Sequence, residues 1–246
     1  MFQGLERIQQ TFFDLTMIRQ VLPDLLTVGL ANTLLLASLS CLVGIFFGLI
    51  VATGLMSQRR SIRLPCRIYV DVLRGLPHIL TIYLIGQGLP LAGLAFFGRN
   101  AYAYAAFSIG LIESAYMAEI FRAGLQSVER GQIDAARSLG LTSGQTMRSI
   151  ILAQGVRRVL PPLTGQFILV LKGTSLVFLL GLTPPQREIF SIAQDAAINN
   201  ANLSPLTAAG LLFLAITVPM TYAVNAWDRR MRLGPRLRPA VDVKES

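Results

Sequence analysis

The longest uncharged stretch of the chain lies between Asp24 and Arg59, and it sets the first limit on the fold. Its centre, NTLLLASLSCLVGIFFGLIVATGLM, is longer than the roughly 20 apolar residues that a helix needs to cross a bilayer. Inside a bilayer every backbone polar group must find a partner within the protein, and a helix meets this condition. The stretch therefore predicts a transmembrane helix. Its Gly44 and Gly48 either let another helix approach closely or are scattered glycines without that role.

Further segments have the same character, so we predict an all-α integral membrane protein with about five transmembrane helices. These segments are the uncharged run between Arg74 and Arg99 and residues at about 100–123, 163–184 and 204–227. The composition agrees, because 53% of the residues are hydrophobic and only 14% are charged. A soluble domain has a larger share of charged residues.

The N-terminal segment, residues 1–24, does not have the pattern of a cleavable signal peptide. Charged residues interrupt it at Glu6, Arg7, Asp14 and Arg19. Its apolar residues recur at helical spacing, as at Leu5, Ile8, Phe12 and Leu15. This spacing predicts an amphipathic segment in the membrane interface on the extracytoplasmic side. We expect the transmembrane permease domain to cover 25–230, and a basic cytoplasmic tail to cover 231–246.

The distribution of positive charge predicts the orientation. Most of the arginines fall in 58–67, in the polar loop at 125–160 and in the tail. Cytoplasmic loops of membrane proteins carry such an excess, so the N-terminus is expected outside and the C-terminus inside. The net charge of +9 is spread over separate short segments, which argues against nucleic-acid binding.

The sequence offers no catalytic residues and no metal site. His78 is the only histidine, and Cys41 and Cys66 have no metal-ligand spacing. We find no P-loop, no H-E-x-x-H, no G-x-S-x-G and no Gly-rich dinucleotide loop. The chain is therefore expected to be neither an enzyme nor the holder of a cofactor.

The longest polar interruption, residues 131–162, predicts two short helices joined by a corner. Asp134 is expected in the first turn of the first helix, and Gly140 at its C-terminal end with a positive φ. The pattern from Thr142 to Gln145 has the spacing of a capping box that opens the second helix. Pro161 and Pro162 are expected to end that helix.

This interruption resembles the EAA loop of permease subunits in bacterial ABC importers. The resemblance rests on Asp134, Ala135 and Ala136, on Gly140 four residues later, and on the apolar helix that follows. It implies that these four residues form a coupling helix that lies in a cleft of the ATPase subunit. The chain departs from the family at Asp134, where glutamate is usual, and at Ala153, where many members carry proline.

Other segments resemble permeases of the histidine/glutamine type, which import polar amino acids. They are 73–77 (LRGLP), 115–122 (AYMAEIFR) with 126–128 (QSV), 159–163 (VLPPL) and 171–176 (LKGTSL). Leu76 stands where threonine is usual, and Gly173 where aspartate is common. The likeness covers roughly residues 25–230.

The resemblance implies an ABC importer type I permease in the bacterial cytoplasmic (inner) membrane. It implies a homo- or heterodimer of permeases, an ABC ATPase dimer that binds and hydrolyses ATP, and an extracytoplasmic substrate-binding protein. The substrate would be a polar amino acid in this binding-protein-dependent transport. The alternatives are a passive channel, which needs no cytoplasmic docking loop, and a membrane-embedded enzyme, which needs clustered metal ligands within its spans.

Ionisable residues inside predicted spans need a partner or line a path. Glu119 and Arg122 are three residues apart on a helix, and we interpret them as a structural ion pair. Lys172 lies well inside its span, and with Thr174, Ser175 and Gln166 it is a candidate for the substrate path. The alternative is a pairing of Lys172 with Glu113 or with a backbone carbonyl. An unpaired lysine there would favour a neutral or acidic amino acid over a cationic one.

Overall fold

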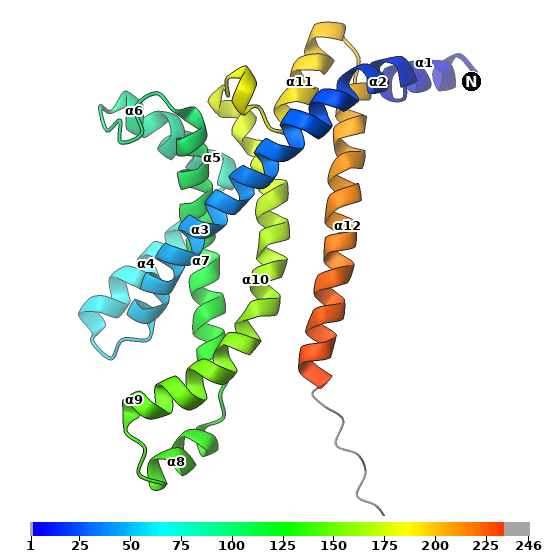
Figure 1. Cartoon of the computed structure of the whole chain (residues 1–246). Helices are drawn as coiled ribbons and strands as arrows, with labels where there is room; N and C mark the ends of the chain where they lie inside the picture. Colours follow the sequence, from blue (N-terminus) through cyan, green and yellow to red (C-terminus); the bar gives the residue numbers. More distant parts are fainter. Residues whose placement is uncertain (1, 234–246) are drawn as a thin grey trace, which may run out of the picture.

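The computed structural model describes residues 2–233, and within this range it contains helices and no strands. Four long helices run side by side along a bundle (Figure 1): α3 (Leu30–Leu55), α7 (Ala101–Gln126), α10 (Ala153–Gly173) and α12 (Ser204–Leu233). Short helices α8 (Arg130–Ser138) and α9 (Ser143–Thr146) lie beyond one end, while α1 (Phe2–Phe12), α2 (Leu15–Asp24) and α11 (Ile189–Asn200) lie at the other. The all-α membrane fold is thereby confirmed.

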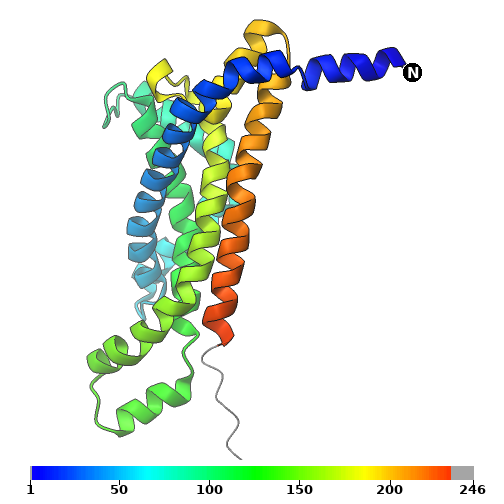
Figure 2. The same ribbon diagram turned by 45° about the vertical axis from the view of Figure 1, so that its right-hand side comes forward.

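The N-terminal segment forms two helices, α1 (Phe2–Phe12) and α2 (Leu15–Asp24). The Asp14 side chain between them accepts hydrogen bonds from the backbone of Thr16 and Met17, which starts α2. Helix α1 lies across the bundle axis (Figure 2). Helix α2 continues through a π-helical turn at Leu25–Gly29 into α3, so no helix boundary separates residue 24 from residue 25. From residue 234 onward, the predicted tail lies outside the described residues.

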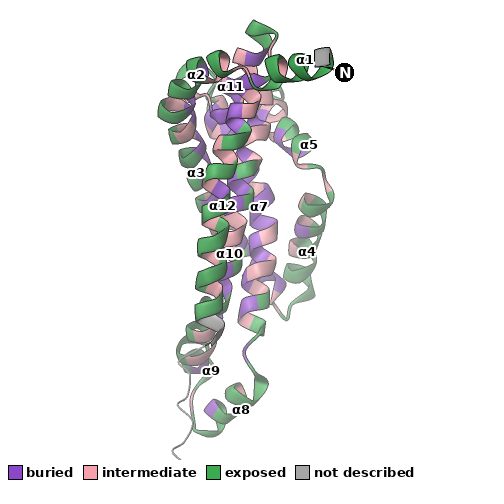
Figure 3. Ribbon diagram, turned by 90° about the vertical axis from the view of Figure 1, so that its right-hand side faces the viewer, coloured by how far each residue is buried: buried purple, intermediate pink, exposed green. Residues whose placement is uncertain are grey.

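Helix α7 packs closely against α3, and Figure 3 shows that α7 is largely buried. A Cβ atom at Gly48 would lie 3.1 Å from the Ser114 carbonyl oxygen, and one at Gly44 would lie 3.0 Å from the Met117 sulfur. Glycine at these two positions lets the helix backbones approach each other. The G-x-x-x-G pair thus faces a helix of the same chain.

The second predicted span, between Arg74 and Arg99, contains the helical stretch His78–Leu91, which is long enough for a span only together with the helix before it. That helix, α4 (Arg60–Gly75), meets the stretch beginning with α5 (His78–Tyr83) at an angle of 108°. Leu76 and Pro77 between them are extended, because a residue that precedes proline disfavours the helical conformation. After a π-helical turn at Leu84–Gly88 and the short α6 (Leu89–Leu91), the chain turns toward α7.

By length and composition, fewer helices qualify as candidate spans than the expected five. In the described part of the chain, three helical stretches are long and apolar enough to cross a membrane, at Gly4–Leu55, Ser143–Leu180 and Ser204–Arg230. The bent pair of α4 and α5 would make a fourth. Helix α7 is not among them, and it carries Glu113, Glu119 and Arg122. These side chains are partly or fully shielded by protein, and the helix itself is largely buried.

Pro161 and Pro162 do not end a helix, and that prediction is wrong. Helix α9 (Ser143–Thr146) leads through a π-helical turn at Met147–Leu152 into α10, which contains both prolines. Each proline removes one backbone hydrogen bond, but the neighbouring helices hold the segment in place. Beyond α10 come a 3-10 turn at Thr174–Leu180 and helix α11 (Ile189–Asn200), which precedes α12.

Candidate functional site

A cavity of about 450 Å³ lies among α5, α7 and α10. Its polar lining consists of His78, Glu113, Tyr116, Gln166, Lys172 and Ser175. Three of the four candidates for the substrate path, Lys172, Ser175 and Gln166, therefore line one cavity. Thr174 does not line it, because its side chain is fully buried and its hydroxyl donates to the Leu171 carbonyl at 2.8 Å.

Glu113 contributes the acidic group of the cavity. Its side chain is only 4% exposed, and it accepts a hydrogen bond of 2.5 Å from the Gln166 amide. Lys172 belongs to none of the ion pairs found among residues 2–233, so it does not form the alternative pairing with Glu113. The cavity thus holds a carboxylate from α7 and an ammonium from α10 that do not neutralise each other directly.

The aromatic side of the cavity comes from α5 and α7. The rings of His78 and Tyr116 meet edge to face with 5.9 Å between their centroids. The Arg74 guanidinium lies 5.1 Å from the centroid of the Tyr116 ring, a cation–π distance. Sequence reasoning did not assign His78 and Tyr116 to the site. The segments that contain Arg74 and Tyr116 resemble segments of the permease family, but the resemblance did not assign either residue to the site.

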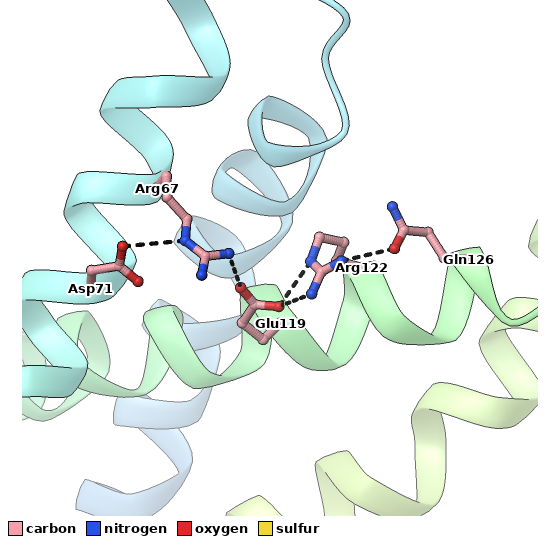
Figure 4. A network of polar contacts seen from close by, with 5 residues as sticks. All are labelled: Arg67, Asp71, Glu119, Arg122 and Gln126. Atoms are coloured by element: carbon pink, nitrogen blue, oxygen red, sulfur yellow. Dashed lines mark hydrogen bonds and ion pairs between the residues drawn. The ribbon is translucent and has the colours of Figure 1, made fainter. Parts of the chain in front are cut away.

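A network of charged groups joins α4 to α7 nearer the α8 end (Figure 4). Glu119 accepts hydrogen bonds from Arg122 at 2.8 and 2.5 Å, and it lies 3.8 Å from Arg67. Arg67 also pairs with Asp71 at 3.2 Å, and Arg122 donates to Gln126 at 2.8 Å. The sequence spacing pointed to Glu119 and Arg122. It missed Arg67, which comes from another helix.

The predicted coupling segment forms α8 (Arg130–Ser138), beyond the end of the bundle. Because the helix begins at Arg130, Asp134 lies in its second turn, and the prediction of a first-turn acid is wrong. Gly140 has a φ of +84°, and Thr142 forms the capping box with Gln145, so both of these local predictions are confirmed.

The four residues expected to couple to an ATPase do not share one environment. Ala136 is 4% exposed and packs inside the loop, whereas Asp134, Ala135 and Gly140 are exposed. The neighbouring Leu139 is 82% exposed. Hydrogen bonds from Gln154 to Gln132 and from Arg137 to Ser143, each of 2.5 Å, connect α8 to the segment that leads into α10.

A protein-family model described as "Binding-protein-dependent transport system inner membrane component" matches residues 44–233. The chain belongs to this family. A probable glutamine ABC transporter permease protein, GlnP of Bacillus subtilis, is 32% identical over 203 residues, covering 82% of this chain and 91% of GlnP. The glutamate/aspartate import permease protein GltK of Escherichia coli O157:H7 is 33% identical over 225 residues, covering 89% and 98% of the two chains.

Solved structures agree with this assignment. A chain in a crystal structure of an amino acid ABC transporter with histidines superposes with a TM-score of 0.79 at 29% identity. The match covers 88% of this permease and 98% of that chain. A chain of the MetNI methionine ABC transporter has a TM-score of 0.67 at 16% identity, covering 85% and 97%, and it supports the fold alone. The resemblance to amino acid ABC permeases is therefore confirmed.

Family membership makes this permease an inner-membrane transport subunit. Within residues 2–233 no group of three or more histidine, cysteine, aspartate or glutamate side chains is placed to hold a metal ion. The polar groups that line the cavity are one ammonium, one carboxylate, an amide, an imidazole and two hydroxyls, which offer charge and hydrogen bonds. These groups suit binding and release of a polar solute.

Proposed function

We propose that this permease carries a polar amino acid through the cavity among α5, α7 and α10. The observation that carries the proposal is the presence of unpaired Lys172 and buried Glu113 on facing helices of one cavity. A free amino acid has an α-carboxylate and an α-ammonium. Lys172 would receive the first and Glu113 the second, while Gln166 orients the Glu113 carboxylate.

Glu113 changes the expected substrate class. The preference for a neutral or acidic amino acid rested on a lysine with no acid near it. Because Glu113 lines the same cavity, a cationic substrate no longer meets an uncompensated positive charge. Similar permeases are named for glutamine, for arginine and for glutamate/aspartate. Recognition of the shared α-amino and α-carboxylate groups fits that range of side chains.

Uptake by transporter reconstituted in liposomes tests the assignment of the cavity. Lys172→Met should reduce uptake of labelled glutamine about 10- to 100-fold, the loss expected when one charge-assisted hydrogen bond disappears. Thr174→Ser is the matched control, because Thr174 is close in the chain but does not line the cavity. Unchanged uptake by Lys172→Met, or an equal loss in Thr174→Ser, would contradict the proposal.

The α8 loop is the proposed docking site for the ATPase. Asp134, Ala135, Leu139 and Gly140 present an exposed surface at one end of the bundle. ATP would be bound and hydrolysed by an ABC ATPase dimer, whose closure would move α8 and, through the continuous α9–α10 segment, the cavity wall. Uptake that persists without ATP and the ATPase would instead indicate a passive channel.

The loop would face the cytoplasm, with the N-terminus outside and the C-terminus inside. Arginines on α8 and at the start of α4 gather at that end, in keeping with the positive-inside rule. The opposite end, with α1, α2 and α11, would meet the substrate-binding protein, and a second permease would complete the pathway. A cysteine at Ser138 should react only from the cytoplasmic side and one at Asn199 only from outside. The reverse pattern would overturn the orientation.

A further inference from the structure

A second cavity, of about 340 Å³, lies where the end of α3, the start of α4 and the end of α7 meet. We name it the arginine pocket, because four arginines line it together with two leucines: Arg60, Arg63, Arg67, Arg122, Leu55 and Leu64. It lies closer to α8 than the cavity among α5, α7 and α10 does. On α7, Arg122 is nine residues beyond Glu113, or roughly 13 Å along the helix axis.

The four arginines of the arginine pocket are not equivalent. Arg67 and Arg122 are held by Glu119, which pairs with both of them (Figure 4). Arg60 and Arg63 take part in none of the ion pairs found among residues 2–233, and both side chains are exposed. The guanidinium groups of Arg67 and Arg122 are therefore held in place, whereas those of Arg60 and Arg63 are available to an external anion.

The α4 helix places these groups next to an apolar surface. Arg60, Arg63 and Arg67 are spaced three and four residues apart, so they share one face of the helix. Leu64 lines the pocket and is 50% exposed, and Ile68, one turn further along, is 54% exposed. A ligand that fits both parts would carry an anionic group and a hydrocarbon chain.

We propose that the arginine pocket binds the phosphate group of an anionic phospholipid. The planar guanidinium group matches phosphate oxygens in a bidentate arrangement, which suits arginine better than lysine. Basic pockets between transmembrane helices bind anionic lipid headgroups in this way. The phosphate lies against Arg60 and Arg63, and an acyl chain follows Leu64 and Ile68. The lipid would lie along α4, beside Arg67 and Arg122, which Glu119 already holds.

The test is a lipid titration of the purified full-length chain, read out by native mass spectrometry. The probes are phosphatidylglycerol, phosphatidylcholine and inorganic phosphate. Each direct contact between a guanidinium group and the phosphate is expected to contribute enough for a roughly fivefold change in affinity, so Arg60→Gln with Arg63→Gln should weaken phosphatidylglycerol binding roughly 25-fold. Neither residue supports the Glu119 network, and circular dichroism should show unchanged folding.

Arg59→Gln is the matched control, because Arg59 is exposed and adjacent but does not line the pocket. We expect less than a roughly twofold effect from it, because it is a solvent-exposed charge outside the pocket. If Arg59→Gln weakened phosphatidylglycerol binding as much as the double variant, the lipid would be held by general electrostatic attraction, and the proposed site would be wrong. Wild-type binding by the double variant, or phosphatidylcholine binding as tightly as phosphatidylglycerol, would also overturn it. Inorganic phosphate that displaces the lipid at equal concentration would assign the site to free phosphate instead.

Discussion

The cavity among α5, α7 and α10 and the loop around α8 obtain their residues from the chain in opposite ways. Glu113 and Gln166 in the cavity are separated by 53 positions yet share a hydrogen bond. The loop is built from neighbours, such as Thr142 and Gln145 in the capping box. The cavity holds the buried carboxyl group of Glu113, whereas most residues of α8 are exposed at the end of the bundle. A substitution should therefore affect solute recognition in the first region and contact with a partner in the second.

The largest expected effect sharpens this contrast at Glu113. Glu113→Gln keeps the shape of the side chain but removes the charge that we assign to the substrate ammonium. Uptake of labelled glutamine should fall about 10- to 100-fold, while ATPase binding to the permease stays unchanged. Uptake and co-purification of the ATPase, measured on the same variant, check these two expectations. If Glu113→Gln instead lost the ATPase, while each complex that still assembled transported normally, Glu113 would serve contact with the partner rather than recognition of the solute.

The second prediction compares two neighbouring residues of the α8 loop that differ in burial. Ala135 is exposed and Ala136 is buried, so tryptophan at the two positions should have different effects. Ala136→Trp overpacks the interior of the loop and should destabilise it by about 1–3 kcal/mol. Ala135→Trp should leave stability within about 0.5 kcal/mol of wild type but reduce ATPase binding and transport.

Limited proteolysis of the loop and co-purification of the ATPase measure these two effects separately. Each variant serves as the control for the other, since both introduce the same side chain one position apart. Wild-type transport by Ala135→Trp would exclude the exposed face of α8 as the docking surface.

The smallest expected effect concerns Gly140, with its φ of +84°. A residue with a β-carbon is strained in the left-handed region by about 1–2 kcal/mol, so Gly140→Val should open the corner after α8 more often. Hydrogen exchange of the loop amides should speed up, with no change in the helices around the cavity. Gly131→Ala is the control, because nothing lies within 4 Å of an added Cβ there and alanine favours the helix. If the loop amides exchanged at the same rate in Gly140→Val and in the wild type, the corner would tolerate a side chain at this position.

Local signals in the sequence were read correctly where few residues decide the conformation. The apolar run after Asp24 became α3, Gly140 took the positive φ, and the capping box formed at Thr142. The same reasoning failed at Pro161 and Pro162, which remain inside α10. There, packing between helices outweighed the rule for an isolated segment. For residues 74–99 the local rule holds, because Leu76 before Pro77 is extended, but the stretch His78–Leu91 is long enough for a span only together with α4.

The sequence by itself determined the all-α membrane class, the polar loop with its caps, and the pairing of Glu119 with Arg122 along one helix. These features depend on hydropathy and on contacts within one or two turns. The tertiary structure alone decided that Glu113 joins Lys172 in one cavity, that Arg67 joins the Glu119 network, and that Ala136 turns inward. The physical reason is that side chains on different helices meet only after the helices pack. Sequence spacing records the face of each helix, but it does not record which faces come together.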